Sequence, residues 1–180
     1  AAYTRARRQS LLLGILISLL LVLLPLSMLF WRPWQANLGA VLETKAQLAA
    51  YTDDDSWMIQ DSVLRVETPA LGNAEEWLAR ALASDPANAT ANRRVGQIAF
   101  ARGNYDAAFA HFQAALSDPF ASRMTLQYLG ELYALRGEPD QAAAIWHMLD
   151  MGQGQLEMRS WWYQYEVADP AQSEQFNAAV

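Results

Sequence analysis

Hydrophobic residues follow two different patterns along this chain. From Leu11 to Trp31 the sequence runs without a charge, and its only polar side chains are two serines. A helix of that length spans about 31 Å at 1.5 Å per residue, which matches the hydrocarbon core of a bilayer. Further along, apolar residues recur at helical spacing rather than in alternation. The pattern therefore predicts an all-α chain with one N-terminal transmembrane helix.

The flanks of the long apolar run indicate how it sits in a membrane. Arginines lead into it and aromatic residues lead out of it: Arg5, Arg7, Arg8, Trp31, Arg32 and Trp34. A cleaved signal peptide would have an apolar run of about 7–15 residues and a small-x-small site, which this run lacks. We therefore expect a retained transmembrane helix over 11–31. The arginine excess places residues 1–10 in the cytoplasm and the remainder in the periplasm or otherwise outside the cytoplasm.

Within the expected span, two small residues one turn apart, Gly14 and Ser18, would let another helix approach closely. Pro25 lacks an amide hydrogen and is expected to kink the helix. No His, Cys or charged residue lies between Leu11 and Trp31, so the span offers no usual side-chain ligand for haem. We expect it to anchor and dock, and we expect no cofactor.

A connecting segment over 32–55 is expected next. Pro33 suits the first turn of a new helix from about 34 to 50, with one apolar face formed by Trp34, Leu38, Val41, Leu42 and Leu48. An acidic turn, Thr52-Asp53-Asp54-Asp55-Ser56, then breaks the helix. It lacks the spaced pattern of a calcium loop, so a helix cap from Asp55 or Ser56 is the better interpretation and no metal is expected.

Beyond residue 73 the sequence repeats itself with a fixed period. Small and large residues recur in phase 34 positions apart: Gly96 and Gly130, Gly103 and Gly137, Ala108 and Ala142, Phe112 and Trp146. Small residues at fixed positions let two helices cross closely, and large residues four positions on fill the space between neighbouring pairs. One such pair cannot bury its own apolar face, so the period predicts a stack of helical hairpins.

The repeat resembles the tetratricopeptide family. The signature is carried by Val95-Gly96, Tyr105, Ala108 and Phe112, and again by Leu129-Gly130, Ala142 and Trp146, while Leu149 and Pro139 depart from it. The resemblance implies a degenerate first repeat over 56–86, a second over 89–119 and a third over 122–150. The degenerate first helix is expected at 56–66. Residues 153–180 are expected to form degenerate capping helices.

Two candidate partner-binding surfaces follow. Concave solenoid surfaces are built from the first helices of repeats, which gives a groove of Arg93, Gln97, Phe100, Gln127, Glu131 and Leu135. Phe100 and Leu135 are expected there as apolar anchors; the alternative is that a neighbouring loop or the 34–50 helix covers them. A C-terminal aromatic cluster is either core or interface: Trp161, Trp162, Tyr163 and Tyr165. Carboxylate-clamp members of the family use Lys and Asn at groove positions that here include Arg93 and Glu131, which disfavours that function.

Composition excludes several classes of function. The chain has no cysteine, and its two histidines stand in no catalytic or metal-binding spacing, so no enzyme is expected. The formal net charge is −6, while residues 1–32 contain four arginines and no acid. The rest of the chain is therefore strongly acidic, which argues against nucleic-acid binding and favours a basic partner surface.

The sequence thus predicts a membrane-anchored scaffold or accessory subunit that mediates protein–protein interaction, with larger membrane subunits as partners. Two alternatives remain open. One is an accessory subunit of a photosynthetic or respiratory energy-transducing complex. The other is a periplasmic adaptor in envelope polysaccharide synthesis or secretion. The segments Ala89-Thr90-Ala91-Asn92-Arg93-Arg94 and Gln153-Gly154-Gln155-Leu156 are loosely similar to the repeat-bearing tails of bacterial polysaccharide ligase or polymerase membrane proteins.

Overall fold

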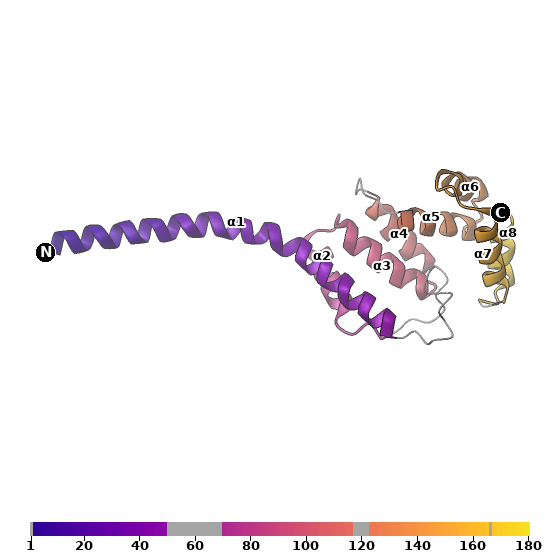
Figure 1. Cartoon of the computed structure of the whole chain (residues 1–180), viewed down its shortest axis with the longest axis horizontal. Coiled ribbons are helices and arrows are strands. Elements are labelled where there is room, and N and C mark those ends of the chain that lie inside the picture. Colours follow the sequence, from indigo (N-terminus) through magenta and orange to yellow (C-terminus); the bar gives the residue numbers. More distant parts are fainter. Residues whose placement is uncertain (1, 50–69, 117–122, 166) are drawn as a thin grey trace.

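A computed structural model of the protein describes the backbone of residues 2–49, 70–116, 123–165 and 167–180; the side chains of 2–10, 28–30 and 32 are outside the description. Every element in these ranges is a helix, which confirms the all-α expectation. Helix α1 (Ala2–Ala49) extends away from a helical body that contains the other helices (Figure 1). Within the described part of the chain, no helix meets the length and apolarity that a membrane crossing requires.

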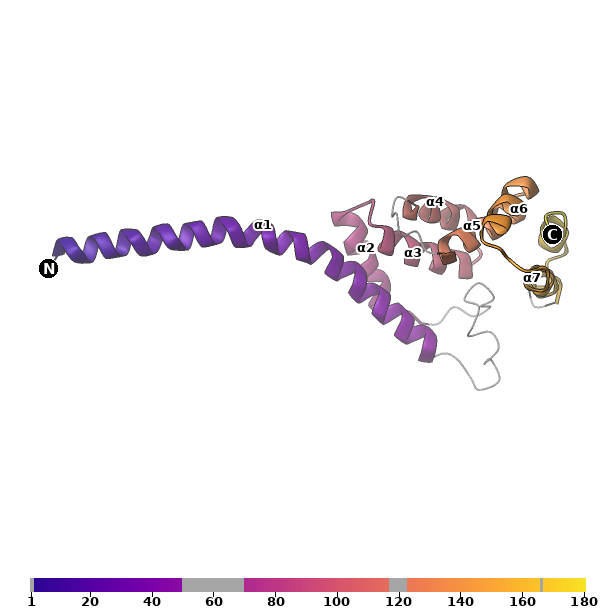
Figure 2. The same ribbon diagram turned by 45° about the horizontal axis from the view of Figure 1, so that its top comes forward.

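Helix α1 is one continuous helix, so the expected break between 31 and 34 is wrong. Pro25 and Pro33 both lie inside it. A proline in a helix interior removes one hydrogen bond and crowds the preceding turn, which bends the helix rather than ending it when the flanking residues remain helical. Figures 1 and 2 both show α1 changing direction where it reaches the body and then running alongside α2 (Ala74–Ser84).

The body is built from helical hairpins. Helices α3 (Ala89–Ala101) and α4 (Tyr105–Ala115) form one, and α5 (Arg123–Leu135) and α6 (Pro139–Met148) form the next. Both hairpins turn through a glycine with positive φ, Gly103 at 71° and Gly137 at 72°. In each, the residue after the glycine donates its N–H to a carbonyl of the first helix at 2.9 Å. Helices α7 (Gln153–Tyr165) and α8 (Pro170–Asn177) close the C-terminal end.

A glycine faces a large side chain at the centre of each of these two hairpins. A Cβ added at Gly96 would lie 3.1 Å from the Phe112 ring, and one added at Gly130 would lie 2.8 Å from Cδ1 of Trp146. Phe112 and Trp146 are buried in one core that runs from the end of α3 to α8. The absence of a Cβ is therefore what lets each pair of helices cross with an aromatic ring between them.

The C-terminal half of α1 supplies the first helix of an additional hairpin. A Cβ at Gly39 would lie 2.8 Å from the side chain of Leu78 in α2, the same relation as in the other hairpins. Leu38-Gly39 thus occupies the place of Val95-Gly96 and Leu129-Gly130. The helix expected over 56–66 and the acidic turn at 52–56 lie outside the described residues. The second cluster of buried residues joins α1, α2 and α3: Ala36, Leu71, Ala74, Leu78, Ala81, Ala91 and Ile98.

Candidate partner-binding groove

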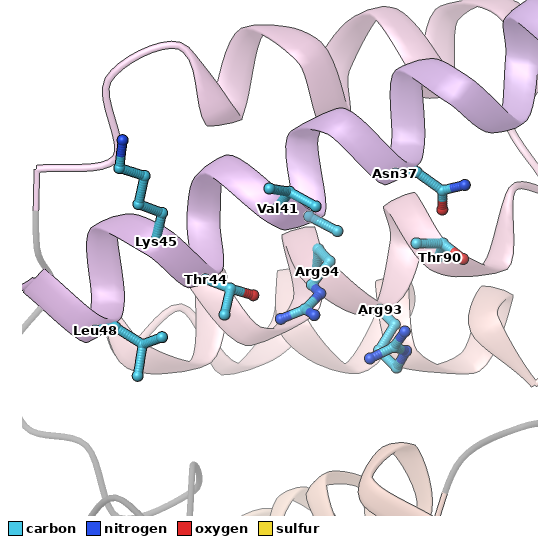
Figure 3. A pocket seen from close by; sticks show the side chains of 9 residues that line it. Asn37, Val41, Thr44, Lys45, Leu48, Thr90, Arg93 and Arg94 are labelled. Atoms are coloured by element: carbon cyan, nitrogen blue, oxygen red, sulfur yellow. The ribbon is translucent and has the colours of Figure 1, made fainter.

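An open groove of about 610 Å³ lies between the C-terminal half of α1 and helix α3. Figure 3 shows that one wall comes from α1 and the other from α3. The lining residues are Asn37, Ala40, Val41, Thr44, Lys45, Leu48, Thr90, Arg93 and Arg94. Because α1 and α3 are the first helices of successive hairpins, the groove lies between equivalent helices of neighbouring hairpins.

The apolar part of the groove comes from α1. Val41 is 63% exposed and Leu48 is 56% exposed. The helix instead turns its smallest residues toward α2, burying Ala36 and Ala40 beside Gly39. Close packing against α2 through small residues leaves the larger aliphatic side chains pointing outward. Val41 and Leu48, two members of the apolar face expected for the 34–50 helix, are therefore exposed and line the groove.

The charged part of the groove is basic. Lys45, Arg93 and Arg94 line it, and none of its described lining residues is acidic. Arg94 is ion-paired with Glu43, whose carboxylate is fully buried, at 2.7 Å. A buried carboxylate without a partner would destabilise the fold. The Glu43–Arg94 pair therefore holds α3 against α1 at the groove. The sequence reasoning missed Glu43; its position four residues after Gly39 could have placed it in the hairpin.

The groove expected from the sequence is only partly open. Arg93 lines the observed groove and Gln127 is half-buried, but Phe100 is 5% exposed and Leu135 is 8% exposed. Phe100 packs against Tyr105 and Tyr128 with ring centroids 5.3 and 5.1 Å away. The expectation that Phe100 and Leu135 stand on the surface as anchors is therefore wrong. Tyr105 of the same hairpin and Tyr128 of the next cover Phe100, and Leu135 belongs to the core that includes residues of α7 and α8.

Gln97 and Glu131, the other members of the expected groove, are also buried. The amide of Gln97 donates to the Met124 sulfur at 2.7 Å. Glu131 is ion-paired with Arg159 of α7 and accepts a hydrogen bond from the Tyr163 hydroxyl at 3.1 Å. Burial, with the Glu131 carboxylate next to it, raises the pKa of Tyr163 well above 10.0. Glu131 thus holds α7 against α5 and does not face a partner.

The aromatic cluster of α7 divides between core and surface. Trp162 and Tyr163 are buried and join the main core, whereas Trp161 and Tyr165 are exposed. Trp161 and Tyr165 lie one turn apart, with ring centroids separated by 5.6 Å. The core interpretation therefore applies to Trp162 and Tyr163, and the interface interpretation is left for Trp161 and Tyr165. Partner binding by the exposed pair stays a prediction.

Two further sets of residues lie apart from the groove. Gly14 and Ser18 are on an exposed, shallow patch of α1, and a Cβ at Gly14 would meet nothing within 4 Å. A helix contact there stays a prediction. His111 is half-buried, its Nδ1 lies 2.9 Å from Oδ1 of Asn92, and burial lowers its pKa below 6.5. In the described ranges, no cluster of His, Asp and Glu has the arrangement needed to hold a metal ion.

Comparison with protein-family models, with curated proteins and with solved structures finds no match to this chain. Its function is therefore inferred from the groove, the hairpins and helix α1 themselves.

Proposed function

We propose that this protein is a single-pass, membrane-anchored scaffold of the tetratricopeptide type, which holds a partner protein at a membrane surface outside the cytoplasm. The main support for the proposal is helix α1, because its N-terminal half is apolar and exposed and its C-terminal half forms one wall of the groove. The large apolar side chains from Leu11 to Leu26 are between 47% and 69% exposed. Water contact with that much apolar surface costs about 25 cal/mol per Å², and a bilayer removes the cost.

The hairpins support the repeat assignment. In three hairpins, a Leu-Gly or Val-Gly pair in the first helix faces a large side chain in the second helix. These large side chains are Leu78, Phe112 and Trp146. These three large residues are spaced by 34 positions. Arrays of such hairpins expose an extended concave surface whose usual ligands are other proteins.

The groove between α1 and α3 favours an acidic partner segment with aliphatic anchors. Val41 and Leu48 offer exposed apolar contact, and Lys45 and Arg93 add positive charge at its edge. An apolar centre with a charged rim is typical of interfaces, and opposite charge raises the association rate. The acidic balance of the whole chain predicts a basic partner surface; the groove departs from that prediction because the charged side chains that line it are basic.

A peptide-binding measurement tests the groove. A fluorescent peptide of alternating glutamate and leucine should bind the full-length protein in detergent, and a lysine–leucine peptide should not. Lys45→Glu combined with Arg93→Glu should weaken the acidic peptide by about tenfold or more, which corresponds to about 1.4 kcal/mol. Arg123→Glu, on the exposed start of α5 and outside the groove, is the matched control. Equal losses in the groove variant and the control would refute the assignment to the groove.

Orientation is tested separately. The chain has no cysteine, so a single cysteine introduced at exposed Ser84 is the only thiol. An impermeant thiol reagent should label it in intact spheroplasts if the repeats lie outside the cytoplasm. Labelling that requires lysis would reverse the orientation and place the partner in the cytoplasm.

A further inference from the structure

Three tryptophan side chains form a continuous cluster at the point where α1 meets α2. Trp31 stacks on Trp34 with ring centroids 5.0 Å apart and an angle of 27° between the planes. Trp34 in turn meets Trp77 of α2 edge-on, with centroids 5.4 Å apart. The guanidinium of Arg80 lies 4.8 Å above the Trp77 ring. We call Trp31, Trp34, Trp77 and Arg80 the junction cluster.

The junction cluster is exposed although it is rich in aromatic surface. Trp31 is 53% exposed, Trp34 is 46% exposed and Trp77 is half-buried. Core packing therefore accounts for only part of it. Aromatic rings that contact each other while remaining open on one side need a second environment that accepts both an apolar ring and a polar indole N–H. The interface between lipid headgroups and hydrocarbon is such an environment.

The position of the cluster matches that environment. Trp31 ends the apolar run of α1, and Trp34 follows it one turn later on the same helix. If the run crosses a bilayer, both residues lie at the bilayer's boundary. Trp77 and Arg80 come from a different helix, which belongs to the hairpin array. Figures 1 and 2 show α2 beside α1 at this end of the body, whereas α7 lies at the opposite end.

We infer that the junction cluster docks the repeat domain onto the lipid headgroup layer, with Trp77 and Arg80 of α2 as direct lipid contacts. This rests on the proposed membrane anchor and adds to it. An anchor alone would leave the domain at any angle to the membrane. Contact through α2 fixes the angle between the repeat domain and the membrane, because Trp77 of α2 packs against Trp34 of the anchor helix α1. Arg80, which also pairs with exposed Glu76, is placed to meet a lipid phosphate beside the Trp77 ring.

Quenching by brominated lipid tests the inference. The full-length chain is reconstituted into phosphatidylcholine vesicles with brominated acyl chains, and the quenched share of tryptophan fluorescence is measured. The chain has seven tryptophans. If three of them meet lipid with equal yield, Trp77→Phe lowers the quenched share from about three sevenths to about one third. Trp161→Phe, at the exposed surface of α7, is the matched control and should raise the share to about one half.

The outcomes separate the two proposals. If the chain does not float with the vesicles, the membrane anchor is wrong and the docking inference falls with it. If the chain floats and Trp31→Phe lowers the quenched share while Trp77→Phe raises it, the anchor stands and the docking of α2 is refuted. A lowered share in both Trp31→Phe and Trp77→Phe supports the inference.

A second measurement avoids any change to the tryptophans. A nitroxide on a single cysteine introduced by Glu76→Cys, exposed on α2 one turn from Arg80, should be more accessible to oxygen, relative to a water-soluble paramagnetic reagent, than a nitroxide introduced by Met158→Cys on the exposed surface of α7. The oxygen preference arises because oxygen concentrates in lipid. Equal accessibility at the two sites would refute contact between α2 and the headgroup layer, whatever the fluorescence shows.

Discussion

Replacing Gly39 with alanine is expected to destabilise the junction between α1 and α2. The new Cβ would lie 2.8 Å from Cγ and Cδ2 of Leu78 and 3.1 Å from the Leu78 backbone nitrogen. Leu78 is fully buried, so its side chain has no open space to move into. The helices must then separate, and overpacking of this kind costs about 1–3 kcal/mol. Alanine recovers up to about 1 kcal/mol of helix propensity relative to glycine.

Because two of the contacts are shorter than 3.0 Å, we place the overpacking cost at about 2–3 kcal/mol, so the net loss should be about 1–2 kcal/mol, which lowers the Tm by about 2–8 °C. Thermal unfolding of the full-length protein in mild detergent, followed by far-UV circular dichroism, measures it. Gly14→Ala is the matched control, because it makes the same substitution in the same helix at a position where the Cβ meets nothing within 4 Å. It should leave the Tm unchanged or raise it slightly, because alanine favours the helix and its Cβ meets no neighbour.

A double-mutant cycle isolates the contact. In a Leu78→Ala background the clashing side chain is gone, so Gly39→Ala should cost nothing there or stabilise slightly. The reasoning is refuted if Gly39→Ala melts with the wild type, or if its cost is the same in both backgrounds. The second result would mean that the methyl group perturbs α1 itself and not its packing on α2.

Two other predictions concern charged residues. Glu131→Ala should cost about 3–5 kcal/mol in chemical unfolding, because it leaves the buried Arg159 without its carboxylate; a loss below about 1 kcal/mol would contradict the ion pair. The hydrogen bond from Arg102 lowers the pKa of Glu75 below 4.5, so this pair stabilises the fold above that pH and its contribution is lost as the pH falls through the lowered pKa. The free energy of unfolding of the wild type should exceed that of Arg102→Ala by less than about 1 kcal/mol at neutral pH, because the Arg102 and Glu75 side chains are both 45% exposed. This difference should vanish in acid, and a difference that does not change with pH would exclude the ion pair as its source.

Helices α3 to α6 occupy ranges that the sequence period predicts because the determinants are local and repeated. A glycine is required twice in each hairpin, once for the crossing and once for positive φ at the turn, and both recur one period later, Gly96 as Gly130 and Gly103 as Gly137. The period does not predict the first hairpin, because its Leu38-Gly39 lies far ahead of position 62, where a strict repeat would put the glycine. A fixed repeat length cannot find a helix separated from its partner by a longer connection.

The contents of the candidate groove were harder to predict. Phe100 is at a first-helix position that is open in a regular array, and only its contacts with Tyr105 and Tyr128 close it. Glu131 looks like a groove residue until Arg159, much later in the chain and on another helix, meets it. Contacts of this range depend on how α7 returns to the array, and no periodic pattern encodes that return. Arg93, expected in the groove as a first-helix position, is half-buried and lines the observed groove between α1 and α3; its part in binding stays a prediction.

The continuity of α1 also has a mechanical consequence. At 1.5 Å per residue its 48 residues measure about 72 Å along the helix axis, and unbroken helix, bent where it reaches the body (Figures 1 and 2), joins the residues that line the groove to those expected in the bilayer. A change of tilt that the bend does not absorb moves Val41 and Leu48 relative to α3, or strains the Glu43–Arg94 pair that holds the two helices together. By thermodynamic linkage, a ligand that binds between α1 and α3 must in turn shift the preferred tilt of α1. We expect bilayer thickness, which sets helix tilt, to tune the affinity of the groove, and occupancy of the groove to bias the thickness in which the protein resides.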